Sequence, residues 1–304
     1  MGMTRREVLK GSVALTAVGA LGIRPIAAQQ ELIKKAIPKT GEMITVIGIG
    51  TNRYGVDASE EQRAPLRDTL KRFRELGGTV IDTAPAYRNS EAVLGDLIAE
   101  LGIRDELFMA TKCNMRSREE SSKQMEESVA RLQWDTIDLM QVHNLMGWEG
   151  QLPAMREWKA AGRIRYIGLT TSQVQQHEEL VKLMQSEDLD FIQVNYSLGD
   201  RAAAERVLPT ALDRGLGVLI NVPLGRGRLF ESVGQQALPD WAAEFDCGSW
   251  GQFFLKYIVS HPAVTVAIPG TRKPHHAEDN LGAAVGRLPD AAMRKRMEDL
   301  IDSI

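Results

Sequence analysis

The sequence is poor in cysteine and, beyond its first thirty residues, has no long apolar run. It contains two cysteines in 304 residues, Cys113 and Cys247, and neither sits in a C-x-x-C pair. This argues against a disulfide scaffold and against a structural zinc site. We expect two buried free thiols, and a single bridge in an oxidising compartment is the alternative. No segment after residue 30 is long enough to cross a membrane as a helix.

Clusters of a single charge sign are also missing. The formal net charge is −3, and Lys and Arg are scattered along the chain rather than gathered into a stripe. Nucleic-acid binding relies on such a stripe, so we expect no nucleic-acid partner. The chain is 43% hydrophobic and 25% charged, an ordinary globular balance, and its length suits one large domain.

The first thirty residues differ in composition from the rest. A basic start at residues 3–10 precedes an apolar, small-residue run at 11–23, and a cleavage zone at 26–30 brings Ala27 and Ala28 before a polar sequence. This three-part layout is typical of an export signal, and the pair Arg5-Arg6 resembles the twin-arginine signal. An amphipathic N-terminal helix or a membrane anchor is the alternative.

Cleavage of a signal peptide at residues 1–28 leaves a barrel domain at 29–304. The cleavage removes four basic residues and one acidic residue, so the formal charge changes from −3 to −6. We expect export by the twin-arginine machinery to the periplasm, with no stable membrane span after processing. The mature protein is expected to be a monomer or a small oligomer.

Short apolar runs alternate with stretches of helical spacing from residue 43 onward. The runs are rich in Val, Ile, Leu and Phe, as expected for parallel strands buried on both faces. They cover residues 44–49, 79–82, 107–111, 137–143, 164–169, 191–195, 217–222 and 264–268. Eight strand–helix repeats favour an α/β fold closed as a (β/α)8 TIM barrel, because closure leaves no sheet edge unpaired.

A doubly wound dinucleotide-binding fold is the main structural rival. It requires G-x-G-x-x-G after an early strand, but the stretch G-I-G-T-N-R at 48–53 lacks the third glycine. We therefore prefer the barrel. The long connection at 224–250, after the seventh predicted strand, is expected to shape the site at the carboxyl ends of the strands.

Polar ionisable residues end three consecutive predicted strands. Asp82 ends the second, Lys112 the third and His143 the fourth, while Tyr87 follows five residues after Asp82. Neighbouring strands lie about 4.8 Å apart, so these side chains can reach one small volume at the barrel mouth. Each alone has an ordinary structural explanation, but their joint position favours a catalytic site.

The chemistry of these four residues is coherent. Reduction of a carbonyl by hydride needs a proton donor, and Tyr87 can serve if a cation lowers its pKa from about 10. Lys112 would supply that cation, and Asp82 would hold and balance it. His143 would orient the carbonyl and donate a hydrogen bond to the forming oxyanion.

Several ordered motifs together resemble the aldo-keto reductase family. They are G-I-G-T at 48–51, I-D-T-A-P-A-Y at 81–87, T-K at 111–112 and D-L-M-Q-V-H at 138–143, followed by I-G-L-T-T-S at 167–172, P-L-G at 223–225 and I-P-G-T-R at 268–272. The resemblance spans roughly residues 43–285. Its catalytic Asp, Tyr, Lys and His fall on Asp82, Tyr87, Lys112 and His143.

The resemblance implies an NADPH cofactor extended across the barrel mouth. Residues that would hold the nicotinamide, the pyrophosphate or the adenosine are Gly50, Thr51, Thr170, Thr171, Gln193, Asn221, Leu224, Gly225, Arg226, Thr271, Arg272 and Asn280. Arg272 and Lys273 suit a 2′-phosphate, which favours NADP, with NAD as the alternative. A solvated basic turn is the other explanation for that pair.

Two positions depart from the family pattern. Asn221 stands where the family often carries an aromatic that stacks on the nicotinamide, and Thr171 replaces the usual Asn. Both affect the grip on the cofactor rather than the four catalytic positions. The substrate pocket is expected to be shaped by Tyr54, Arg88, Met115, Trp148 and residues 224–250, without fixing what it encloses.

The leading hypothesis is therefore an NAD(P)H-dependent oxidoreductase that reduces a small-molecule aldehyde or ketone, with Tyr87 as general acid. The alternative is a nucleotide-binding barrel with little turnover, serving as a redox sensor or partner-binding module. A (β/α)8 hydrolase is weaker, because the barrel mouth has neither a carboxylate pair nor a metal triad, and we expect no metal site.

Overall fold

Eight short strands form one parallel sheet within residues 31–304, the part of the chain described by the computed structural model. Residues 1–30, which include the predicted signal peptide at 1–28, lie outside the described residues. The strands pair in chain order and are β3 (Ile49–Gly50), β4 (Val80–Asp82), β5 (Phe108–Cys113), β6 (Ile137–Val142), β7 (Ile164–Thr171), β8 (Phe191–Asn195), β9 (Gly217–Asn221) and β10 (Val266–Ala267).

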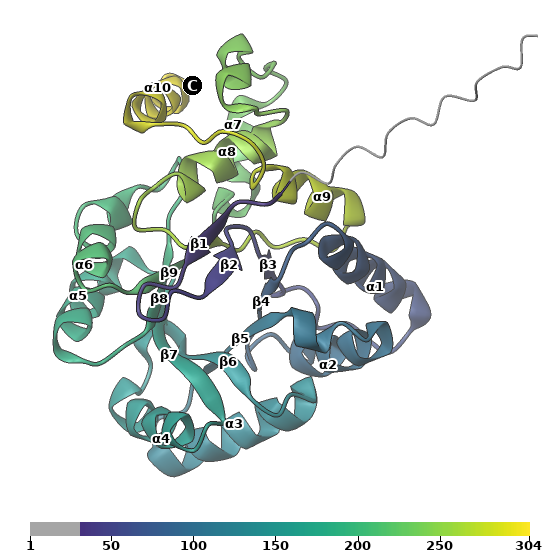
Figure 1. The fold of residues 1–304 in the computed structure, drawn as a ribbon, viewed down its shortest axis with the longest axis vertical. Helices are drawn as coiled ribbons and strands as arrows, with labels where there is room; N and C mark the ends of the chain where they lie inside the picture. Colours follow the sequence, from purple (N-terminus) through teal and green to yellow (C-terminus); the bar gives the residue numbers. More distant parts are fainter. Residues whose placement is uncertain (1–30) are drawn as a thin grey trace, which may run out of the picture. The chain divides into compact units, whose positions relative to one another are not determined.

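The sheet closes on itself. Parallel bridges join Ile47 to Ala267 and Gly50 to Gly270, so the segment around β3 meets the segment around β10. In Figure 1 the strands form a ring with the helices outside it. The predicted (β/α)8 barrel is confirmed.

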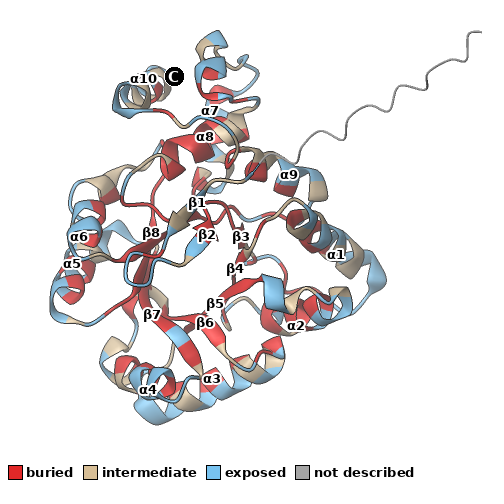
Figure 2. Ribbon diagram, viewed as in Figure 1, coloured by how far each residue is buried: buried red, intermediate tan, exposed pale blue. Residues whose placement is uncertain are grey.

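Helices surround the strands (Figure 1). They are α1 (Glu60–Glu75), α2 (Ser90–Leu101), α3 (Arg118–Leu132), α4 (Trp148–Ala160), α5 (His177–Ser186), α6 (Val207–Asp213), α7 (Arg228–Val233), α8 (Trp250–Val259), α9 (Pro274–Gly282) and α10 (Ala291–Asp302). In Figure 1, α7 and α10 lie beyond α8. The buried faces of the helices around the barrel turn toward the strands (Figure 2), as in α1, where Leu66, Leu70 and Phe73 recur at helical spacing. Within the described residues, no helix is long and apolar enough to span a membrane.

The predicted connection at 224–250 contains α7 and precedes α8. It is not an irregular loop throughout, because short helical turns run along it.

The barrel interior is a separate core from the one between strands and helices. Its floor is a cluster of inward side chains from the strands β4 to β10, among them Val80, Phe108, Leu139, Tyr166 and Phe191. Tyr166 and Phe191 meet edge to face with ring centroids 5.5 Å apart. The larger core, between strands and helices, holds most of the remaining buried apolar residues.

Side-chain alternation along the strands places polar groups above this floor. Residues two apart on a strand point to the same face. Val80 on the floor is therefore followed by Asp82, Ala110 by Lys112, and Leu139 by Gln141. Along these three strands the interior thus changes from an apolar layer to a polar layer.

An antiparallel hairpin packs against the floor and was not predicted. β1 (Lys34–Ala36) pairs with β2 (Met43–Thr45), and Ile37 and Ile44 of this hairpin belong to the interior cluster. The single strand expected at 44–49 is therefore wrong, since its first part lies in the hairpin and only its end lies in the barrel. A Cβ at Gly48 would lie 2.8 Å from the Val80 carbonyl oxygen, so the chain approaches the barrel closely where the two parts meet.

Gly95 provides a test of the packing between α2 and α3. A Cβ at this position would lie 2.3 Å from the Arg131 carbonyl oxygen, a backbone atom at the end of α3. Alanine normally stabilises a helix interior by roughly 0.5–1 kcal/mol over glycine, but overpacking costs about 1–3 kcal/mol, so Gly95→Ala should lower the free energy of unfolding. Urea titration measures this change.

The exposed Ala99 on the same helix is the matched control. Ala99→Gly should lose only the helix propensity, roughly 0.5–1 kcal/mol. Stabilisation by Gly95→Ala would mean that α2 and α3 are not as closely packed as described.

Candidate active site

Four side chains converge at the carboxyl end of the barrel. Asp82 is the last residue of β4, Lys112 lies in β5, His143 follows β6 directly, and Tyr87 lies in the loop after β4. The Lys112 Nζ lies 5.3 Å from the centre of the Tyr87 ring. The Tyr87 and His143 rings meet edge to face, with centroids 6.0 Å apart. The structure thus brings together the four residues predicted to be catalytic.

Lys112 and Asp82 form a buried ion pair. The Nζ lies 2.6 Å from Asp82 Oδ2 and donates a second bond of 2.7 Å to the Thr83 carbonyl, and the two side chains are 1% and 4% exposed. Burial lowers the pKa of Lys112, but the negative charge and hydrogen bond of Asp82, with a contribution from the Tyr87 hydroxyl, outweigh burial, so its pKa lies above the ordinary value. Lys112 is therefore a fixed cation beneath the Tyr87 hydroxyl.

The other carboxylate oxygen of Asp82 accepts two amide hydrogen bonds. Gln193 Nε2 lies 3.0 Å and Gln141 Nε2 3.3 Å from Oδ1. Gln193 was expected to hold the nicotinamide, and Gln141 was given no role. Gln141 lies beside Lys112 in the β5–β6 register and points inward two residues before His143, which is the signal that identifies it. Every oxygen of the buried carboxylate thus has a partner, as burial of charge demands.

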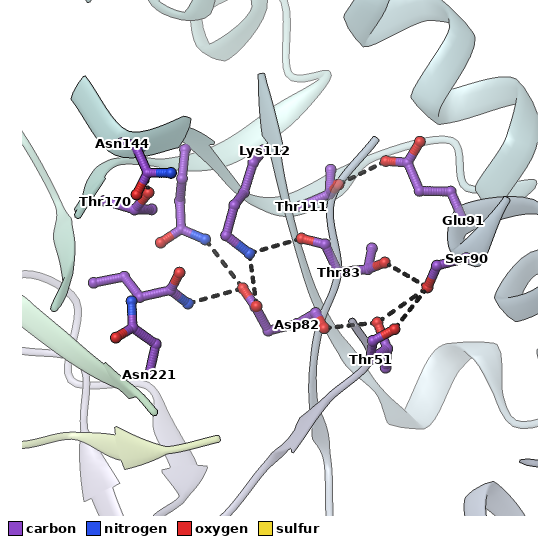
Figure 3. Close-up of polar contacts among 12 residues, drawn as sticks. Thr51, Asp82, Thr83, Ser90, Glu91, Thr111, Lys112, Asn144, Thr170 and Asn221 are labelled. Atoms are coloured by element: carbon purple, nitrogen blue, oxygen red, sulfur yellow. Dashed lines mark hydrogen bonds and ion pairs between the residues drawn. The ribbon is translucent and has the colours of Figure 1, made fainter. Parts of the chain in front are cut away.

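Backbone contacts fix the position of Asp82 (Figure 3). The Asp82 carbonyl accepts from the Thr51 amide at 3.0 Å and from Thr51 Oγ1 at 2.9 Å. Ser90, the first residue of α2, donates to the Thr51 carbonyl at 3.1 Å. Thr51 was predicted to bind cofactor, and it both lines the cavity and anchors the strand that carries Asp82.

A buried glutamate holds the neighbouring strand. Glu91 in α2 is 1% exposed and accepts from Thr111 Oγ1 at 2.6 Å, from Ser128 Oγ at 3.2 Å and from Arg131 Nε at 2.8 Å. Thr111 precedes Lys112 and points to the opposite face of β5. The Glu91 network therefore ties the catalytic strand to α2 and α3, and Figure 3 shows its contact with Thr111.

His143 is uncharged at neutral pH. Burial, and then the positive charge of Lys112, lower its pKa from 6.5 to about 4. The imidazole can thus donate one N–H hydrogen bond to a substrate oxygen without being a cation. It is poorly suited to supply the proton itself, since little imidazolium exists at pH 7.

At three places in the site, the residue directly after a predicted site residue has a positive backbone φ angle. Arg88 after Tyr87 has φ 57°, Asn144 after His143 has φ 54°, and Val222 after Asn221 has φ 49°. The left-handed region costs a non-glycine residue about 1–3 kcal/mol, and a β-branched valine is especially rare there. Such strain persists where the surrounding structure holds the backbone in one geometry, which is typical of functional sites.

A cavity of about 840 Å³ opens above these residues. Asp82, Tyr87 and His143 line it. So do nine of the predicted cofactor residues: Gly50, Thr51, Thr170, Gln193, Asn221, Leu224, Arg226, Thr271 and Arg272. Two lining residues have a buried polar atom without a hydrogen-bond partner, Tyr54 Oη and Asn221 Oδ1. The Asn221 Nδ2 donates to the Thr171 carbonyl at 3.1 Å.

The other three predicted cofactor residues lie behind the cavity wall. Thr171 is fully buried and bonds to Gln176 at 2.5 Å, Gly225 is buried, and Asn280 lies 8% exposed on α9. Of the residues predicted to shape the pocket, Tyr54 and Arg88 line it, as does part of 224–250, but Met115 and Trp148 do not.

The cavity also has lining residues that the sequence did not single out. Arg53 and Asn144, for example, each follow the end of a strand, and that position is the signal that could have found them. Cys113 and Cys247 are both buried and free. Among residues 31–304, no group of three or more His, Cys, Asp or Glu side chains could hold a metal ion.

Comparison with known proteins gives consistent results. A family model described as the aldo/keto reductase family matches residues 46–301. The aldo-keto reductase YhdN of Bacillus subtilis (strain 168) is 33% identical over 211 residues, which cover 64% of this chain and 62% of that protein. The methylglyoxal reductase YeaE of Escherichia coli (strain K12) is 29% identical over 268 residues, covering 86% of this chain and 93% of that protein.

Solved structures share the fold. An aldo-keto reductase from Klebsiella pneumoniae, in complex with NADPH, superposes with a TM-score of 0.75 at 25% sequence identity. The match covers 89% of this chain and 96% of the other.

The neutrality of His143 can be measured by NMR. Its ring nitrogens should show no titration between pH 5 and pH 8 and a pKa of about 4. Since the unfolded side chain has a pKa of about 6.5, the His143 contribution to stability should be complete above that pH and decline as the pH falls toward 4.

The His143→Gln spectrum assigns the signal, and the urea-unfolded chain provides the ordinary titration as a control. A midpoint near 6.5 in the folded protein would contradict the burial of the imidazole beside the Lys112 cation.

Proposed function

The chain belongs to the aldo/keto reductase family, and we propose that it reduces an aldehyde or ketone to an alcohol, with NADPH as hydride donor and Tyr87 as proton donor. The observation that carries the proposal is the stack of Asp82, Lys112 and Tyr87, with neutral His143 beside it, at the base of one cavity. The alternative of a binding module has no such observation in its favour, because binding alone does not need a buried cation beneath a tyrosine.

The residues at the cavity fit NADPH. Arg226, Arg272 and Lys273 lie on the loops after β9 and β10 and supply the positive charge that the pyrophosphate and 2′-phosphate need. The unpartnered Asn221 Oδ1 suits a carboxamide N–H of the nicotinamide. Arg272 and Lys273, the pair suited to the 2′-phosphate, favour NADP over NAD, and NAD is the alternative cofactor.

When bound, NADPH supplies the hydride that attacks the carbonyl carbon and is left as NADP⁺. The side chains of the protein supply the proton. Tyr87 Oη donates it to the carbonyl oxygen as negative charge develops there. The Lys112 cation stabilises the tyrosinate that remains, and Asp82 holds Lys112 in place. Solvent then returns the proton to Tyr87.

His143 contributes a hydrogen bond rather than a charge. Its neutral imidazole can donate one N–H to the carbonyl oxygen, which orients the substrate against Tyr87 and stabilises the oxyanion. A charged imidazolium would compete with Tyr87 as the acid and would repel Lys112. The low pKa thus separates the two roles.

Removal of the Tyr87 hydroxyl tests the proton donor. Tyr87→Phe should reduce kcat for carbonyl reduction by roughly 10²–10⁴-fold, the usual contribution of a general acid, while NADPH still binds. Steady-state assays follow NADPH absorbance, and nucleotide fluorescence follows binding.

Tyr166→Phe is the matched control, because the Tyr166 hydroxyl bonds to Thr40 and Glu42 on the barrel floor instead. It should keep wild-type kcat. If Tyr87→Phe retained full turnover, another group would have to be the acid.

We also propose that the protein is exported to the periplasm through the twin-arginine machinery, as a signal peptide at 1–28 followed by a barrel domain at 29–304. The support is the composition of the first thirty residues: a basic start with Arg5-Arg6, an apolar small-residue run, and small residues before a polar sequence.

Substitution of both arginines tests the export route. Arg5→Lys with Arg6→Lys keeps the charge but removes the paired guanidinium groups, so the protein should remain in the cytoplasm of a host with that machinery. Immunoblots of cell fractions measure the distribution, and Arg24→Lys, in the same segment, is the control. Unchanged periplasmic protein in the double variant would refute the twin-arginine route.

A further inference from the structure

The cavity at the barrel mouth is strongly cationic. Four arginines and a lysine line it, whereas the only acidic residue among its described lining is Asp82, which Lys112 neutralises. The chain as a whole has a formal charge of −3, so this positive charge is a local concentration. A concave site lined by one sign of charge concentrates ligands of the opposite sign.

The cations form two groups. Arg226, Arg272 and Lys273 follow β9 and β10 and suit the cofactor phosphates. Arg53 and Arg88 follow β3 and β4 instead. Arg88 is the residue after the proton donor Tyr87, so its group borders the place where a carbonyl must lie.

Close packing fixes the two loops that carry Arg53 and Arg88. A Cβ at Gly55 would lie 2.5 Å from the Tyr87 carbonyl oxygen and 2.8 Å from the Arg88 Cβ, so the loops touch. Asn89 Nδ2 also donates to the Val56 carbonyl at 2.6 Å. Both arginines are thus held on the same side of the cavity.

A tight turn fixes the backbone at Arg88. The Tyr87 amide bonds to the Ala84 carbonyl at 3.0 Å, and the Ser90 amide bonds to the Tyr87 carbonyl at 3.1 Å. Arg88 has φ 57° between them. The backbone that carries the Arg88 side chain is therefore held in one geometry.

Neither arginine has an acidic partner. Within residues 31–304, Arg53 and Arg88 make no ion pair and no side-chain hydrogen bond. Both residues are exposed, and both line the cavity. Other arginines are paired, such as Arg63 with Asp96 at 3.0 Å and Arg131 with Glu91 at 2.8 Å. The unpaired guanidinium groups can therefore bind an anionic group of a ligand.

We propose that the substrate is an anionic carbonyl compound, bearing a carboxylate or phosphate a few bonds from the carbonyl, and that Arg88 with Arg53 binds this anion. The inference rests on the proposed carbonyl reduction and specifies its substrate class. Arginine binds either anion through two parallel N–H bonds, which also fixes the direction of the ligand. With the anion at Arg88, the carbonyl lies toward Tyr87 and His143.

Matched substrate pairs test the proposal. Succinic semialdehyde is compared with butanal, and glyceraldehyde 3-phosphate with glyceraldehyde, each at saturating NADPH. For at least one pair, kcat/KM should be tenfold or more higher for the anion, and that ratio should fall as salt rises. The pair with the larger ratio distinguishes a carboxylate from a phosphate.

Arg88→Gln should lower this ratio roughly tenfold or more, the usual effect of losing a charged hydrogen bond. Arg116→Gln is the control, because Arg116 is an exposed arginine in the loop after β5 that does not line the cavity. Its ratio should match that of the wild type. The Kd of NADPH for Arg88→Gln separates substrate binding from cofactor binding.

Three results would overturn the inference. The ratios are near one in the wild-type protein, the ratio survives Arg88→Gln, or Arg88→Gln weakens NADPH binding as much as it weakens the use of the anion. In each of these, the neutral aldehydes are still reduced and the proposed function stands. Reduction of no carbonyl at all would instead refute the proposed function itself.

Discussion

The ion pair between Lys112 and Asp82 is the interaction on which the rest of the site depends. Both side chains are almost wholly inside the barrel, and removing one partner from such a pair costs about 3–5 kcal/mol, because the other charge is left uncompensated. Gln141, Gln193 and the Thr83 carbonyl complete the hydrogen bonds of the pair. The polar layer above the apolar floor is thus built around one pair of charges.

Two consequences follow from a cation fixed at that depth. It stabilises negative charge on the Tyr87 oxygen, and it helps to keep His143 neutral, with a pKa of about 4. One tyrosine can therefore supply a proton while one histidine supplies only a hydrogen bond. The same end of the barrel carries unpaired arginines at the cavity. Positive charge is therefore paired in the interior and unpaired where a ligand enters.

Strand ends could be predicted from the sequence, and contacts across the interior could not. Asp82, Lys112 and His143 were predicted to meet, because consecutive parallel strands end at one edge and alternation fixes which residues point inward. The hairpin was missed because Lys34 and Lys35 interrupt the apolar pattern that would indicate a strand at its start. The bonds from Gln141 and Gln193 to Asp82 depend on barrel closure, which brings together residues 59 and 111 positions apart in the chain. Positive φ at Arg88 and Val222 has no local sequence signal, since neither is glycine or asparagine.

Transfer of a labelled hydride tests whether this barrel reduces a carbonyl compound. The purified protein is given an aldehyde and NADPH that carries deuterium at the reactive nicotinamide carbon, and the product is analysed by NMR. We expect an alcohol with deuterium on the former carbonyl carbon, in equal amount to the NADPH oxidised. Tight binding of NADPH without its oxidation by any aldehyde or ketone, charged or neutral, would contradict the proposed carbonyl reduction.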